Sequence, residues 1–255
     1  MSASGTDRLV GVRAKIERAK KHVGELQIAL GAFYQTNPYV VRPEDDANTG
    51  DLIYRLCAAA SIPIEIPIIV GDVLHNLRSA MDHLVWQLVE ANGNAPRERA
   101  TCFPVGESPE KHESRADRSA KGVCEEAMNL IADAKPYKGG DDDLWHVHEL
   151  NNIDKHRLLL PAATYNQSLD IPTQGGLIAL PSTIPLLFEE GKVLLRITAA
   201  ARAGGISEQM GGHPQFSFHV ALAEPDDIRR EPLVPTLIRL CRAVDGLVGR
   251  FAHLL

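Results

Sequence analysis

A narrow apolar seam that recurs in two distant segments constrains the fold more than any other feature of this sequence. In the first segment, apolar residues alternate in steps of three and four: Leu9, Val12, Ile16, Ala19, Val23, Leu26, Leu30 and Phe33. The same spacing returns later at Leu237, Cys241, Val244, Val248, Phe251 and Leu255. Because this spacing keeps apolar side chains on one stripe of a helix, it predicts long helices over about 6–34 and 232–255. Each seam then needs a partner, either in the chain or in a second copy.

Two further helical segments are expected between the seams. The stretch 65–91 begins after a proline and ends before an Asn-Gly pair, and these residues bound a second long helix. The stretch 122–157 holds a short helix that Pro136 ends and another that the acidic run 141–143 is suited to cap. Together with the seamed segments, these helices favour a four-helix bundle.

Turn-forming and β-prone residues predict two β segments. A hairpin is expected over about 38–58 around "DDANTGD", and an antiparallel sheet over about 158–222, where short apolar runs alternate with Gly and Pro. The polar stretch 93–121 is typical of a surface loop or a short exposed helix, where function is less expected than on the polar-faced helices. The predicted fold is α+β and predominantly α: a single domain over 1–255, a bundle of long helices with an antiparallel side sheet.

Composition limits the classes of partner. The chain has 255 residues with 44% hydrophobic content, enough for a sizeable core. Its 27 Lys and Arg against 33 Asp and Glu give a net charge of −6, which disfavours broad electrostatic binding to membranes or nucleic acid. The four cysteines form no Cys-x-x-Cys pair, so neither zinc nor a disulfide framework is indicated, and we expect no cofactor. No secretory signal or run of roughly 20 apolar residues occurs, so a cytoplasmic protein is expected.

Polar residues gather unexpectedly on two of the predicted helices. On the segment 65–91 these residues are Asp72, His75, Asn76, Ser79 and His83. On the segment 141–157 they are His148, Asn151, Asp154, Lys155 and His156. The helical spacing aligns most of the first set in one polar stripe that lacks the Lys and Glu of an ordinary solvated face. If the two helices pack together, these groups meet in a partly buried space, as a structural polar network or as a site.

Within "LRSAMDHL", Arg78 and His83 resemble the signature of the HEPN superfamily, in which an Arg is followed a few residues later by a His. Many of these helical-bundle proteins are ribonucleases, so the resemblance implies an endoribonuclease that cleaves RNA without metal at a site assembled across a homodimer. His83 would act as general acid or base and Arg78 would hold the phosphate. On one unbroken helix the two side chains lie about 140° apart, so a bend or a second subunit must bring them together. The superfamily often has Asn, Asp or His directly after the Arg, where this chain has Ser79.

Other interpretations stay open. The chain also resembles a group of uncharacterised bacterial proteins with stretches like "GDVLHNLRSAMDHL" and "HELNNIDKHR", here within 71–84 and 147–160. That likeness implies one shared site without naming an activity. The alternatives to a ribonuclease are a catalytically lapsed relative, a non-enzymatic binding or structural protein with a buried polar network, and a metal-binding bundle that resembles DinB-like metalloproteins. The last would draw on ligands such as His146 and Glu149, although neither His-Glu-x-x-His nor Glu-x-x-His occurs.

Overall fold

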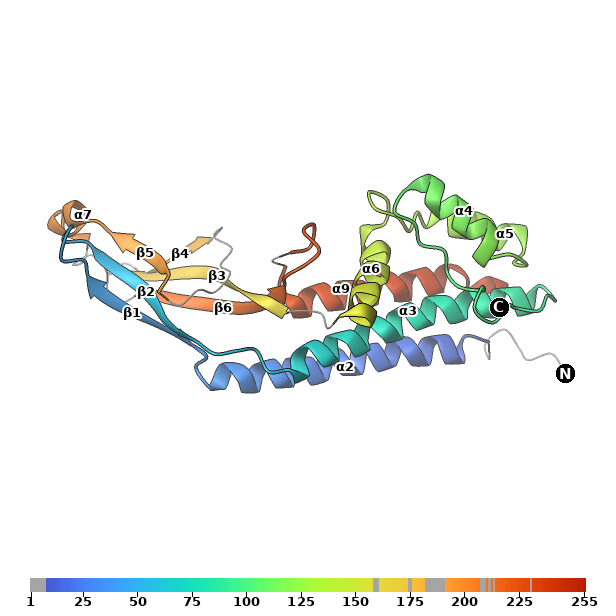
Figure 1. The fold of residues 1–255 in the computed structure, drawn as a ribbon, viewed down its shortest axis with the longest axis horizontal. Helices are drawn as coiled ribbons and strands as arrows, with labels where there is room; N and C mark the ends of the chain where they lie inside the picture. Colours follow the sequence, from blue (N-terminus) through green and yellow to red (C-terminus); the bar gives the residue numbers. More distant parts are fainter. Residues whose placement is uncertain are drawn as a thin grey trace. The chain divides into compact units, whose positions relative to one another are not determined.

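The structure is a computed structural model that describes residues 8–157, 161–173, 176–181, 191–206, 210, 212, 214–229 and 231–255. Its elements are α2 (Val10–Gln35), β1 (Tyr39–Asp45), β2 (Leu52–Ala59), α3 (Glu65–Ala91), α4 (Pro109–Ser119), α5 (Glu125–Asp133), α6 (Asp142–His156), β3 (Pro161–Thr173), β4 (Gly176–Pro181), β5 (Val193–Ile197), α7 (Ala199–Ala203), β6 (Gln215–Leu222), α9 (Leu233–Arg250) and the 3-10 helix η1 (Ala252–Leu254) (Figure 1). The predicted α+β, predominantly α class is confirmed. Among the described residues, no helix is both long and apolar enough to cross a membrane.

The chain forms two compact units. The helical unit takes the chain up to Ile28, the segment from Pro67 to Leu159, and the segment from Val234 onward. The β unit takes the two segments between them. Each unit is therefore assembled from stretches far apart in the sequence, and α2 contributes to both. This explains why the sequence, which predicts a single domain, offers no linker between two parts.

The helical unit is built on α2, α3 and α9. An ion pair between Arg8 and Glu90, at 3.8 Å, joins the start of α2 to the end of α3, so the two helices are antiparallel. Lys20 reaches Asp245 of α9 at 3.0 Å. Every residue of both predicted seams is buried. The chain itself covers both seams, so neither is left to mediate the expected homodimer, which stays a prediction.

The β unit contains two antiparallel three-stranded sheets rather than one side sheet. The predicted hairpin over 38–58 is confirmed as β1 and β2, with Tyr39 opposite Ala59. In the segment predicted as one sheet, β5 pairs with β2, whereas β3, β4 and β6 form the second sheet in the order β4-β3-β6. The rings of Phe218 and Tyr39, 5.0 Å apart between centroids, join β6 to the first sheet. Residues 158–160, 174–175 and 182–190 of the predicted sheet lie outside the described residues.

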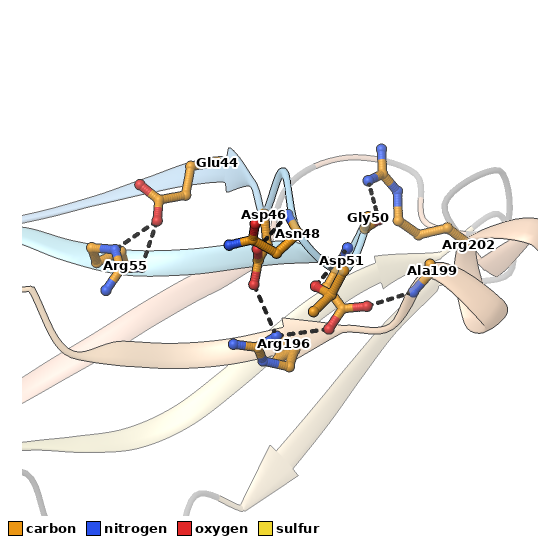
Figure 2. Close-up of polar contacts among 10 residues, drawn as sticks. Glu44, Asp46, Asn48, Gly50, Asp51, Arg55, Arg196, Ala199 and Arg202 are labelled. Atoms are coloured by element: carbon orange, nitrogen blue, oxygen red, sulfur yellow. Dashed lines mark hydrogen bonds and ion pairs between the residues drawn. The ribbon is translucent and has the colours of Figure 1, made fainter.

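The hairpin turn is tied to β5 and α7 through Asp51, which Figure 2 shows between Arg196 and Ala199. One carboxylate oxygen accepts from Arg196 Nη1 at 2.7 Å, and the other accepts from the Ala199 amide at 2.8 Å. The bond from Arg196, followed by that from Ala199, lowers the pKa of Asp51. Arg202 pairs with Asp45 at 2.6 Å. Arginines of the same unit thus hold the acidic turn, and we interpret this cluster as structural.

Candidate anion-binding site

Helices α3 and α6 approach each other at Gly71. A Cβ atom added at Gly71 would lie 2.5 Å from Asp154 Oδ2 and 2.8 Å from Asp154 Cγ, closer than such atoms can come. With a larger residue at position 71, the Asp154 side chain would have to move from its place against α3. The described parts of the two segments, 71–84 and 147–157, thus approach each other through Gly71 and Asp154.

The stripe on α3 faces solvent for most of its length. Asp72, His75 and His83 are exposed, whereas Asn76 and Ser79 are half-buried. On α6, Asn151 is buried, His148 and Asp154 are half-buried, and Lys155 and His156 are exposed. The approaches of α6 to α3 that the structure describes lie at Gly71 and, through His148, near Arg78, and the expectation that the stripe meets α6 stays a prediction.

Arg78 is the buried charge of α3, with 7% of its surface exposed. Its Nη2 donates to the Phe103 carbonyl at 2.8 Å and lies 2.7 Å from Asp82 Oδ1. The Phe103 amide donates to the same carboxylate oxygen at 2.9 Å. Arg78 and Asp82, one helical turn apart, thereby clamp the loop before α4. Arg78 Nη1 is buried and has no hydrogen-bond partner among the residues that the structure describes.

Arg78 lies in the wall of a cavity of about 770 Å³, which we call the Arg78 pocket. The cationic side chains that line it are Arg78, Arg97, Arg115, Arg118 and Lys121. Asp117 is the one carboxylate of this lining. The loop 100–105 supplies a largely apolar wall, and α6 supplies His148 and Asn152. Five positive charges against one negative charge make this pocket strongly cationic within a chain whose net charge is −6.

His148 is held as a neutral imidazole in this pocket. Its Nε2 lies 3.0 Å from Asn152 Nδ2 and 3.4 Å from Arg115 Nη1. Because a guanidinium can only donate, Nε2 is the acceptor and the ring proton belongs on Nδ1. Burial, followed by the nearby charges of Arg78, Arg115 and Lys155, lowers the pKa of His148 to about 3. The imidazole is therefore uncharged near neutral pH.

His83 lines a different cavity, of about 520 Å³, together with Arg8, Trp86 and Gln87. Arg78 and His83 consequently do not share a pocket in this chain, in line with the angle that separates them on the helix. No three His, Cys, Asp or Glu side chains gather as metal ligands within the described residues. The imidazoles of α6 are dispersed as well: His146 is buried and His156 is exposed.

Most cations of the Arg78 pocket come from the stretch 93–121, where function was the less expected. Ser108 begins α4 as its N-cap, with its side chain accepting from the Lys111 amide, and Arg115 and Arg118 follow on the helix. Basic residues at 115, 118 and 121 recur every three positions, which is the signal that could have revealed a basic helical face.

Comparison with protein-family models, with curated proteins and with solved structures gives no match in any of the three.

Proposed function

We propose that the helical unit binds a phosphate-bearing ligand in the Arg78 pocket. The observation that carries the proposal is the Arg78 guanidinium, which is buried in the pocket wall with Nη1 unpartnered among the described residues. A buried donor without an acceptor costs roughly 1–3 kcal/mol, and more when it is charged. Nη1 itself is fully buried, so an anion in the pocket becomes its acceptor after a small rotation of the guanidinium.

Phosphate is the anion that best suits these residues. Guanidinium groups present fixed forks of N–H donors that match phosphate oxygens, and charge-assisted hydrogen bonds of this kind are among the stronger ones in proteins. Asp82 offsets part of the Arg78 charge but contacts Nη2 rather than Nη1. Arg97, Arg115 and Arg118 make no ion pair within the described part of the chain.

Binding is better supported than catalysis in this pocket. His148 has a pKa of about 3, so it holds no proton to give as an imidazolium near neutral pH. Its Nε2 lone pair already faces the Asn152 amide and Arg115. We therefore favour the non-enzymatic alternative among the sequence-based hypotheses, with His148 as a fixed part of the wall.

The test is a titration with inorganic phosphate followed by ³¹P NMR at low ionic strength. We expect saturable binding that Arg115→Gln weakens by about tenfold, the loss of one charge-assisted hydrogen bond. Arg18→Gln is the matched control, because Arg18 is an exposed arginine of α2 that does not line the pocket. Absence of saturable binding, or equal affinities for the two variants, would overturn the proposal.

A HEPN-like ribonuclease, or a lapsed relative, is the second candidate function. The position of His83 favours it, since this exposed imidazole shares a cavity with Arg8 and Trp86, a guanidinium and an aromatic surface suited to RNA. Purified protein is incubated with RNA in metal-free buffer, and wild type is compared with His83→Ala. An active ribonuclease predicts cleavage that the substitution abolishes; no cleavage, or equal cleavage by both proteins, would exclude the active enzyme.

A further inference from the structure

We infer that the ligand of the Arg78 pocket carries a diphosphate group, two phosphates joined by a bridging oxygen. The inference rests on the proposed function and names the ligand class of that same site. It follows from the way in which four arginines of the pocket fall into two adjoining pairs.

The inner pair is Arg78 and Arg115. Arg78 Nη2 donates to the Phe103 carbonyl at 2.8 Å, and Arg115 Nη1 donates to the Val105 carbonyl. These two carbonyls are two residues apart on one loop, so one stretch of backbone fixes both guanidiniums. The charges of Arg78 and Arg115 both act on His148, which places them around the same imidazole.

The outer pair is Arg97 and Arg118. Arg97 Nη2 donates to the Arg118 carbonyl, and Arg118 Nε donates to the Ser114 carbonyl at 3.0 Å. Both arginines are exposed at the mouth of the pocket, where Lys121 adds a further charge. These residues form a second cationic group that no carboxylate pairs with among the described residues.

Helix α4 sets the spacing between the two pairs. Arg115 of the inner pair and Arg118 of the outer pair are three residues apart, and side chains at that spacing are neighbours on a helix face. The pairs therefore adjoin rather than lie at opposite ends of the cavity. Neighbouring cation pairs match neighbouring phosphates that share a bridging oxygen, whereas phosphates far apart on a scaffold would need separated sites.

Charge and preorganisation point the same way. Each of the four guanidiniums is held by a backbone carbonyl, so a ligand meets donors that are already fixed and need little further ordering. The five cations of the lining, set against Asp117 of the lining and Asp82 paired with Arg78, leave an excess of three positive charges. A single phosphate carries about −1.5 to −2 at neutral pH, so two phosphates neutralise that excess better than one.

The experiment compares inorganic phosphate, inorganic pyrophosphate, a nucleoside monophosphate and a nucleoside diphosphate by isothermal titration calorimetry against the full chain. We expect pyrophosphate to bind at least about tenfold more tightly than phosphate, as added charge-assisted hydrogen bonds imply. Arg118→Gln should remove most of this advantage, since it alters only the outer pair. Arg18→Gln is the control that should change neither affinity.

The outcomes separate this inference from the proposed function. Equal affinities for phosphate and pyrophosphate, or an Arg118→Gln variant that keeps the difference, would overturn the diphosphate inference and leave phosphate binding intact. No binding of any of the four compounds would overturn both. A nucleoside diphosphate that binds more tightly than pyrophosphate supports an organic diphosphate as the source, and the reverse order supports an inorganic polyphosphate.

Discussion

Replacing Gly71 by alanine tests the contact that brings α3 and α6 together. The new Cβ would lie 2.5 Å from Asp154 Oδ2 and 2.8 Å from Asp154 Cγ. Overpacking of this kind costs about 1–3 kcal/mol. Replacing a glycine inside a helix by alanine stabilises the helix by about 0.5–1 kcal/mol. Because the atoms met are the end of one half-buried side chain that can yield, we expect Gly71→Ala to lower the free energy of unfolding by up to about 2 kcal/mol.

Gly24→Ala is the matched control, because Gly24 lies inside α2 and no atom would come within 4 Å of an added Cβ. That variant should gain up to about 1 kcal/mol from helix propensity alone. Both substitutions are measured by urea unfolding with tryptophan fluorescence, since Trp86 and Trp145 both belong to the helical unit. In an Asp154→Ala background, Gly71→Ala should become stabilising. Equal stabilisation by Gly71→Ala and Gly24→Ala in the wild-type background would refute the close approach of α3 and α6.

Other expectations concern titrating groups and one turn. The folded pKa of His148, about 3, is below its ordinary 6.5, so its contribution to stability is present above pH 6.5 and is lost as the pH falls toward 3. The free energy of unfolding of His148→Gln should therefore depend less on pH across that window. An unchanged pH dependence of that free energy would contradict this expectation. Asp51→Asn should speed hydrogen exchange at the Ala199 amide, because that amide donates to the carboxylate. Unaltered exchange would contradict the structural role of Asp51. Burial raises the pKa of Cys241 to about 11, so iodoacetamide at pH 8 should label exposed Cys57 first, as mass spectrometry can check.

The elements that the sequence predicted well are those bounded by residues that start or end helices and strands. The segment 65–91 has prolines before it and Asn-Gly after it, and α3 spans Glu65–Ala91. The turn formers at 45–51 lie between β-prone runs, and the hairpin forms there. In both cases local residues decide where an element starts and stops. Pairing between distant strands has no such signal, which is why the partnership of β5 with β2 was not anticipated.

The candidate site was predicted only in part, because its charges come from a stretch without an apolar pattern. Residues 93–121 have the composition of a solvated loop, and a loop's path depends on what it binds rather than on periodicity. Here the path is set by Arg78 and Asp82, which hold the Phe103 carbonyl and amide. Neither partner is visible from the loop's own sequence, since the contact spans 25 and 21 residues along the chain.

The same clamp explains why the Arg and the His of the HEPN-like motif separate in this chain. A residue four positions after Arg78 lies on the same side of α3, and that residue is Asp82, which the guanidinium contacts. A residue five positions after it is turned by about a further 100°, and that residue is His83, which lines the other cavity. A long arginine stem can be buried along an apolar helix face while its head reaches a polar loop. Arg78 therefore belongs with Asp82, Phe103 and the cations of α4, whereas Arg8 is the arginine that lines a cavity together with His83.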